Sequence, residues 1–388
     1  MKKRTFVPAR GVSNIELFYD LIFVYCISVI TTTMHHVDGF FTWAQWAEFT
    51  FSYLVILQIW LFTTFLMNRY GEHSADDNVC LFVEMFLLYF LAHSIQGGWR
   101  DSVFTFNMAW ALILANLIVH WAFKRLRYGN IDDVDKRIMT GIMIVLAIEM
   151  GIVIFAAFLP SPESGIASWV ALFFGAAVFA QSGLYRRKPA RFAHLVERCT
   201  LLTIIAFGET IVALATYMTE SVSLEFSVLV FALVVGLFLI YIYERDNMTD
   251  HHKETDGMAY LTLTGWIILV IGNITVALEY MPMDDIDFVA KSAYLMVSLV
   301  LYLVTSFMLG YFNKPAFRYT LAYTVGRLGV CLGIVAVALM TNFNPIVNLV
   351  CDVVLVYAAL GHEWMLYRRR TAALAFGNSI LGSDADDD

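Results

Sequence analysis

The chain has 388 residues, of which 60% are hydrophobic and 15% are charged, and its net charge at pH 7 is −8. This composition excludes an ordinary soluble domain, in which about 25% of the residues are charged. The sequence shows no basic patch, so nucleic acid is not an expected partner. Apolar runs of about 20 residues, divided by short polar breaks, instead predict an all-α, multi-pass membrane protein in a lipid bilayer. A membrane β-barrel would need alternating segments of about ten residues.

The N-terminal segment is predicted to remain in the protein as the first span. Lys2, Lys3 and Arg4 provide a basic start, but the apolar stretch that follows contains Glu16 and Asp20. A cleavable signal peptide has an uncharged apolar core and a small-residue cleavage site.

Polar, Pro and Gly positions divide the chain into twelve predicted transmembrane helices. They cover residues 17–37, 43–67, 77–97, 103–123, 138–159, 165–185, 196–218, 224–244, 257–279, 288–311, 316–340 and 344–366. Cytoplasmic segments collect Lys and Arg. With the N-terminus inside, only Arg100 and Lys291 of the 25 basic residues fall in outer loops, and Arg327 falls within a span. The pattern predicts that both termini are cytoplasmic.

An internal repeat is predicted from matched charges. Glu16 and Glu197 open the first and seventh spans 181 positions apart, and Arg137 and Arg318 precede the fifth and eleventh spans at the same separation. Six spans in each half would give a parallel repeat, with residues 1–190 and 191–370 as the halves of one membrane domain and a substrate path between them. The short tail, residues 371–388, ends in acidic residues and is predicted to be disordered.

Charged residues within the spans are the candidate functional residues. Glu209 has no other charge around it from Leu201 to Leu214, although a charge at bilayer depth costs about 2.5–3.5 kcal/mol on insertion scales. Glu149 and Arg327 also fall near the middle of their spans. Glu84 falls in the inner half of the third span and Asp352 in the outer third of the twelfth. These five residues are predicted to line a substrate or proton path.

Arg327 requires a carboxylate partner because a guanidinium does not lose its proton. Depth allows Glu209 or Glu149, and the sequence does not choose between them. A carboxyl group without a cation at this depth is expected to be neutral, because burying its charge is costly. The alternative is purely structural, with one buried ion pair and neutral, hydrogen-bonded acids that hold helices together.

A second set of charges is predicted to form a network at the cytoplasmic end. Glu16 and Asp20 are four residues apart and share a helix face, so they need a common cation, for which Arg198 beside Glu197 is the candidate. Ser13 is predicted to cap the helix that contains Glu16. The cap explains Glu16 but not Asp20, which lies one turn deeper.

Other residue types suggest less chemistry. Gly208, next to Glu209, is predicted to kink its helix or to allow close packing. The pairs His35-His36 and His251-His252 are predicted on opposite sides of the membrane and do not indicate a metal site. His93 and His120 lie within or near spans, where a satisfied buried histidine is the expected role. The cysteines, Cys26, Cys80, Cys199, Cys331 and Cys351, are isolated packing residues. No metal, cofactor or catalytic residue is predicted.

Two segments carry a family resemblance. ELFYDLIFVYCIS, which begins at Glu16, and HLVERCTLLTIIAFGETIV, which begins at His194, resemble motifs of the bacterial low temperature requirement protein A (LtrA) family. The matching positions are Glu16, Phe18, Asp20, Leu21, Phe23, Val24, His194, Glu197, Arg198, Gly208 and Glu209. The chain departs from the motif at Cys199, Thr200 and Thr210, and it lacks a His near Tyr260. The resemblance implies a many-span protein of the bacterial inner membrane, from a family named for growth in the cold.

The leading functional hypothesis is a secondary transporter or permease for an unidentified small solute or ion. Coupling of this transport to protons is part of the hypothesis. An ion or proton channel would use the same residues without alternating access. A third class is a membrane sensor, a scaffold or a lipid-related enzyme linked to growth at low temperature. The sequence lacks the HExxH and GxSxG motifs, so no enzyme is predicted. It leaves the oligomeric state open.

Overall fold

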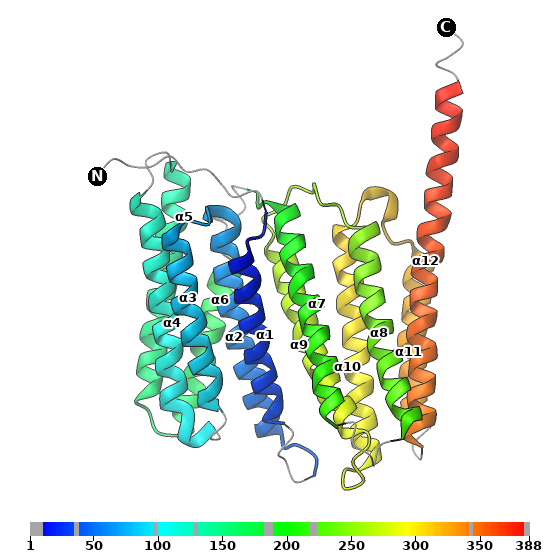
Figure 1. Ribbon diagram of the computed structural model, residues 1–388, viewed down its shortest axis with the longest axis horizontal. Coiled ribbons are helices and arrows are strands. Elements are labelled where there is room, and N and C mark those ends of the chain that lie inside the picture. The colour runs from blue at the N-terminus through cyan, green and yellow to red at the C-terminus, as the bar shows by residue number, and fades with distance from the viewer. Residues whose placement is uncertain are drawn as a thin grey trace. The chain divides into compact units, whose positions relative to one another are not determined.

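The fold is entirely helical in the part of the chain that the structure, a computed structural model, describes: residues 11–34, 39–95, 99–127, 131–181, 189–217, 223–340 and 344–383. The helices are α1 (Asn14–Thr32), α2 (Trp43–Tyr70), α3 (Ala75–Ser94), α4 (Trp99–Arg127), α5 (Asp133–Ala157), α6 (Glu163–Gln181), α7 (Phe192–Tyr217), α8 (Leu224–Asn247), α9 (Met258–Tyr280), α10 (Phe288–Leu309), α11 (Leu321–Met340) and α12 (Pro345–Ser383) (Figure 1). Two short 3₁₀ turns, Gly310–Phe312 and Pro315–Phe317, precede α11. The predicted helical class is confirmed.

The chain forms two compact units. The first contains Met1–Ala206 and His252–Gly265, and the second contains Phe207–His251 and Trp266–Asp388. Helices α7 and α9 therefore each contribute residues to both units. This division differs from the predicted halves, because residues 191–206 and 252–265 belong with the first unit. The proposed duplication stays a prediction.

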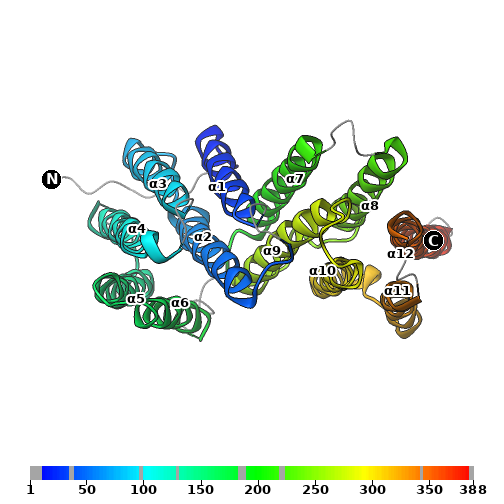
Figure 2. The ribbon, with the colours of Figure 1, turned by 90° about the horizontal axis from the view of Figure 1, so that it is seen from below.

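Helix α2 lies in the middle of the first unit. It packs against α1, α4 and α6, while α3 bridges α1 and α4, and α5 packs between α4 and α6 (Figure 2). Most of the side chains of α2 are buried, including Trp60 and Gln58. Any polar group on α2 is therefore placed inside this unit.

In the second unit, α12 packs against α8, α10 and α11. Phe207 of α7 contributes an edge-to-face contact with Tyr302 of α10, with ring centroids 6.1 Å apart. The hydroxyl groups of Thr210 and Thr275 are hydrogen-bonded at 2.9 Å and join α7 to α9. Aromatic packing thus dominates the apolar interior, with single hydroxyl contacts between helices.

Side-chain caps determine where several helices begin. Ser13, Thr42 and Ser74 each accept a hydrogen bond from the backbone three residues on, in a capping box with Glu16, Gln45 and Asp77. Such a box satisfies backbone N–H groups that the helix itself leaves without partners. The predicted cap at Ser13 is confirmed.

Within the described residues, ten helices, α1, α2, α4, α5 and α7 to α12, are long and apolar enough to cross a membrane. Helix α3 is not among them, since it contains Asp76, Asp77 and Glu84. Its outer face nevertheless exposes apolar side chains such as Phe86, 67% exposed. Exposed apolar surface of this kind fits a lipid environment. The predicted multi-pass membrane character is supported. Ten of the twelve helices meet the length and composition requirement for a span in their described residues.

Two helix boundaries differ from the prediction. Helix α12 continues to Ser383, so the part of the tail from residue 371 to 383 is helical and not disordered. Ala and Leu are strong helix formers, and extending an existing helix needs no new nucleus. Helix α11 begins at Leu321 and not at residue 316, because Pro315 begins a separate 3₁₀ turn. The last five residues lie outside the described part of the chain.

Candidate functional site

A buried arginine forms the centre of the polar site in the first unit. Arg198, near the start of α7, is fully buried, and its Nη2 lies 3.1 Å from Oδ1 of Asp20. Its Nη1 lies 3.4 Å from Oε1 of Glu16. The guanidinium also lies 5.7 Å and 5.8 Å from the ring centroids of Tyr19 and Trp60. We call Glu16, Asp20, Trp60 and Arg198 the Arg198 cluster. The predicted pairing of Arg198 with both acids of α1 is present.

Glu16 serves as a helix cap and as an ion-pair partner at once. Its Oε2 accepts a hydrogen bond from the Ser13 backbone at 2.9 Å and lies 3.0 Å from Nε2 of His73. His73 has a backbone φ of 54°, a conformation that is uncommon for a residue with a side chain. Burial lowers the pKa of Arg191, and the nearby Glu16 carboxylate offsets part of that effect. Glu16 therefore faces several basic groups.

Glu84 of α3 lies beside the Arg198 cluster in the same unit. Its Oε1 accepts a hydrogen bond from the Tyr19 hydroxyl at 2.8 Å and another from the Thr63 hydroxyl at 2.5 Å. Its Oε2 is buried and has no hydrogen-bond partner among the described residues. Tyr19 thus contacts Glu84 through its hydroxyl and Arg198 through its ring.

Helix α2 supplies a polar partner to one buried group after another. The Trp60 indole N–H donates to Oδ1 of Asp20 at 2.8 Å, Thr63 donates to Glu84, and Tyr70 donates to Oδ1 of Asp135 at 2.9 Å. Asn68 Nδ2 lies 3.3 Å from Nδ1 of His194. Sequence analysis missed this role because α2 has no charge in its central part. Gln58, Thr63 and Asn68, three polar residues in an apolar helix, were the available signal.

Glu149 of α5 is fully buried in the same unit, away from any arginine partner. The Gln58 amide of α2 is its polar neighbour. Gly175 of α6 lies directly against both side chains, since a Cβ at this position would clash with Oε2 of Glu149 and Nε2 of Gln58. Glu149 therefore occupies the junction of α2, α5 and α6.

Arg327 pairs with a residue that the prediction did not consider. Its Nη2 contacts Oε1 of Glu363 on α12, so neither Glu209 nor Glu149 is its partner. Arg327 lies six residues after the start of α11, a helix of 20 residues, or about 9 Å along it. Its depth in a membrane stays a prediction. Glu363 falls near the end of the predicted twelfth span and was not weighed as an intramembrane acid.

A second polar network surrounds this pair in the second unit. Tyr323 donates to Oε1 of Glu363 at 2.9 Å, and its ring stacks on Tyr319 with centroids 4.1 Å apart. Tyr319 donates in turn to Oε1 of Glu244 at 2.5 Å. We call Arg327, Glu363, Tyr323, Tyr319 and Glu244 the Arg327 cluster. Glu244 also lies 3.2 Å from Nη2 of the adjacent Arg245, so this cluster has one arginine close to each acid.

Several other predicted site residues lie apart from both clusters. Glu197 is exposed, and Glu209 is half-buried with no hydrogen bond or ion pair found in the described ranges. Gly208 is exposed, and a Cβ there would meet no atom within 4 Å, so the predicted close packing is absent. Helix α7 continues without a break through it. Asp352 is buried in α12.

Histidines were weighed as metal ligands or as members of a proton path. His120 is buried and lies 2.9 Å from Asp77, whose other cationic neighbour is Lys124 at 2.5 Å. Its Nε2 has the partner expected of a satisfied histidine, whereas its Nδ1 makes no hydrogen bond within the described residues. His93 is exposed and stacks on Tyr89. His35 and His36 lie outside the described residues. No group of three potential metal ligands occurs in the part of the chain that was searched.

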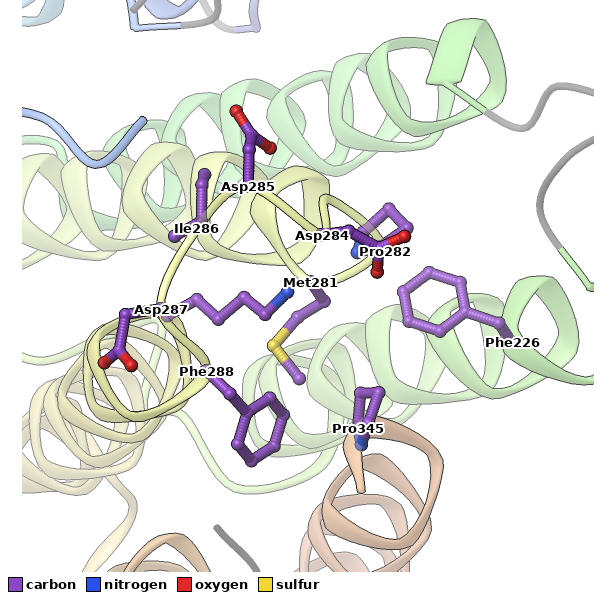
Figure 3. Close-up of a pocket in the computed structure, with 10 residues that line it drawn as sticks. Phe226, Met281, Pro282, Asp284, Asp285, Ile286, Asp287, Phe288 and Pro345 are labelled. Carbon is purple, nitrogen blue, oxygen red and sulfur yellow. The ribbon is translucent and has the colours of Figure 1, made fainter. Parts of the chain in front are cut away.

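The second unit also contains an open pocket of about 550 Å³ near the loop between α9 and α10 (Figure 3). Asp284, Asp285 and Asp287 lie on its lining together with Lys291, whose Nζ donates to the Met283 carbonyl at 2.5 Å. The lysine ammonium is thus held by backbone within the pocket wall. The pocket is acidic overall, and Asp284 and Asp285 are exposed.

The helices and the buried ion-pair clusters define the class: a multi-pass helical membrane protein with charged networks inside its helix bundle. The family model described as bacterial low temperature requirement A protein (LtrA) matches residues 11–361, and the chain belongs to this family. The resemblance of the two motifs is confirmed. An uncharacterized protein of Rhizobium meliloti (strain 1021) is 23% identical over 287 residues, which cover 68% of this chain and 67% of that protein. No solved structure matches.

Proposed function

We propose that the protein is a proton-coupled secondary transporter or permease of the bacterial inner membrane, built as two parallel six-helix halves with both termini in the cytoplasm. One observation carries this proposal. Along α2, Gln58, Trp60 and Thr63 each contact a different buried acid, namely Glu149, Asp20 and Glu84. Intramembrane acids in series are typical of proton relays in pumps and transporters.

The spacing of these contacts supports a relay. Gln58 and Thr63 are five residues apart, or about 8 Å along α2. Asp20 is about 9 Å from the start of α1 and Glu149 is about 24 Å from the start of α5. With the N-terminus inside, α1 and α5 would both begin at the cytoplasmic side. The Arg198 cluster would then lie near the cytoplasm and Glu149 in the opposite half of the bilayer.

The charge balance of the Arg198 cluster supports proton binding. Arg198 makes direct ion pairs with two acids, and Glu84 lies next to them. A buried carboxylate without its own cation is stabilised by taking up a proton, because desolvation penalises the charged form. The cluster can therefore bind and release a proton without losing all of its ion pairs.

The proposal concerns transport of a small solute or ion and assigns no catalytic residue. A channel would use the same acids without alternating access, and its flux would not saturate with solute. A sensor, a scaffold or a lipid-related enzyme would show no flux at all. The oligomeric state does not enter the argument.

Reconstituted liposomes that contain a pH-sensitive dye provide the test. A panel of small amino-acid, sugar and inorganic-ion solutes is added on one side, and solute-dependent proton movement is recorded. Wild-type protein should move protons with at least one solute, and Asp20→Asn should abolish this movement while the protein remains folded. Glu197→Gln, an exposed acid of the same motif, is the matched control. Absence of coupled flux with every solute, or full flux in Asp20→Asn, contradicts the proposal.

Glu209→Gln belongs in the same assay. The sequence predicts that Glu209 contacts a proton or solute, and the half-buried position of its side chain leaves it able to do so. Reduced flux would place it on the path together with the acids that contact α2. Unchanged flux would remove Glu209 from the path without affecting the rest of the proposal.

A further inference from the structure

In the described part of the first unit, Glu149 has no cation against its carboxyl group, unlike Glu16, Asp20 and Asp77. Asp20 and Glu16 contact Arg198, and Asp77 contacts Lys124. For Glu149, burial and the Gln58 amide are the influences found in the described part of the unit. Neither carboxyl oxygen makes a hydrogen bond of normal geometry there. An ionised carboxylate in such a place would be strongly destabilised.

The space around the carboxyl group is shaped by a glycine. Gly175 of α6 lies where any larger residue would overlap Glu149 and Gln58 at once. The Gln58 Nε2 also lies 3.4 Å from the Leu172 carbonyl, one turn earlier on α6. The amide is therefore held between the α6 backbone and Glu149. Three helices meet here with room for one carboxyl group and one amide.

Aromatic side chains pack on the N-terminal side of Gln58 along α2. Phe51 precedes Gln58 by seven residues and so lies on the same face of α2, about 10 Å away along the helix. Its ring centroid lies 5.0 Å from that of Trp169 and 6.0 Å from that of Trp110.

Polar atoms without partners occur at the same level as the rings. Thr50 Oγ1, Ser52 Oγ and Trp110 Nε1 are buried and make no hydrogen bond within the described residues, and Gln58 Oε1 is in the same condition. Buried groups of this kind are rare in folded proteins and are explained by exchange with water or by a functional role. Thr50 and Ser52 flank Phe51 on α2, and the Trp110 ring contacts that of Phe51.

We propose that Glu149 is a proton-exchange site, a neutral carboxylic acid that sits over Gly175 and exchanges its proton through the polar side chains near the N-terminal end of α2. Gln58 and Gly175 are positioning residues. From the packed helices, Gln58 of α2 and the Gly175 backbone of α6 face the acid. The described side chains of α2, α4 and α6 place no titratable group among its polar neighbours. The role of Glu149 in transport rests on the proposed function. The spectroscopic test of the site does not depend on that function.

Infrared difference spectroscopy of the purified full-length protein in lipid nanodiscs tests the site without a transported solute. Spectra are recorded in H₂O and D₂O over a pH series. The wild type should show the carbonyl stretch of a protonated carboxylic acid that shifts in D₂O and disappears at high pH. Glu149→Gln should lack this band. Glu363→Gln, which alters a buried acid paired with Arg327, should keep it.

A second variant covers the case in which Glu149→Gln does not fold. Gln58→Leu removes the amide and should shift the frequency of the band without abolishing it, because the acid loses its polar neighbour. Identical bands in the wild type and Glu149→Gln, or no shift in Gln58→Leu, overturn the proposal. A band that responds to neither D₂O nor pH also overturns it, since the proton would not exchange. Failure of the transport function would appear separately, as absence of flux in wild-type liposomes.

Discussion

The Arg198 cluster of the first unit and the Arg327 cluster of the second both combine arginine, acidic and aromatic side chains. They differ in the number of acids for each arginine. Both place a buried arginine against carboxylates and aromatic rings. Arg198 is shared by two acids, whereas Glu363 is the acid that pairs with Arg327 in the described residues, and Glu244 has Arg245 beside it. A balanced set of charges holds helices together. A set with a surplus acid can also take up a proton, so the first unit is the place to look for proton chemistry.

Removal of Arg198 should have the largest effect on stability. Arg198→Met leaves Asp20 and Glu16 buried without their direct cation, and loss of one partner of a buried pair costs about 3–5 kcal/mol. With two acids affected, we expect the upper end of this range or no folded protein. Unfolding with a denaturing detergent in mixed micelles measures it. Arg198→Lys keeps the charge and should lose less. A loss below about 1 kcal/mol would contradict the central role of Arg198.

Removal of Arg327 should cost less and should be reversible by a second change. Arg327→Met strands only Glu363, so we expect a loss of about 3 kcal/mol in the same unfolding measurement. Adding Glu363→Gln should recover most of that loss, because the buried carboxylate that lost its arginine is then neutral. The corresponding double variant of the first unit, Arg198→Met with Asp20→Asn, should recover less, since Glu16 still lacks the guanidinium. Equal recovery in both units would remove the difference between the clusters.

Two matched glycine substitutions should have the smallest effects on stability, and these effects should be opposite in sign. Gly175→Ala forces a methyl group into Glu149 and Gln58, and overpacking of this kind typically costs about 1–3 kcal/mol. Gly208→Ala meets no atom within 4 Å and should stabilise its helix by up to about 1 kcal/mol, because Ala has the higher helix propensity. Thermal unfolding in detergent compares the two variants. A destabilised Gly208→Ala would show that Gly208 packs closely after all.

The helical class could be predicted because the period and length of apolar runs are local properties of the sequence. The ion pair between Arg198 and the two acids of α1 was also predictable, since a shared helix face and a buried charge together require a cation. The Ser13 cap follows from a short-range pattern. Each of these inferences depends on residues close in sequence or on buried charges that are too costly without a partner.

Other contacts depend on packing that the sequence does not encode locally. The choice of Glu363 for Arg327 is set by how α11 and α12 pack, and by the short 3₁₀ turn that shifts the start of α11. The contacts of α2 with Glu149 and Glu84 join residues 91 and 21 positions apart in sequence. Gln58 and Thr63 carry no charge, so nothing in their own segment marks them as partners of acids. Gly175 becomes informative only when its neighbours are known.

The most direct test compares one acid from each unit in a proton-flux measurement. Glu84→Gln and Glu363→Gln both replace a buried carboxyl group that accepts a tyrosine hydroxyl. Each variant is reconstituted at equal protein content in liposomes that contain a pH-sensitive dye, with a pH gradient and the solute that supports wild-type flux. The account predicts that Glu84→Gln loses proton flux by at least about tenfold, equivalent to 1.4 kcal/mol, while Glu363→Gln retains it. Loss of flux in Glu363→Gln with normal flux in Glu84→Gln would contradict the account.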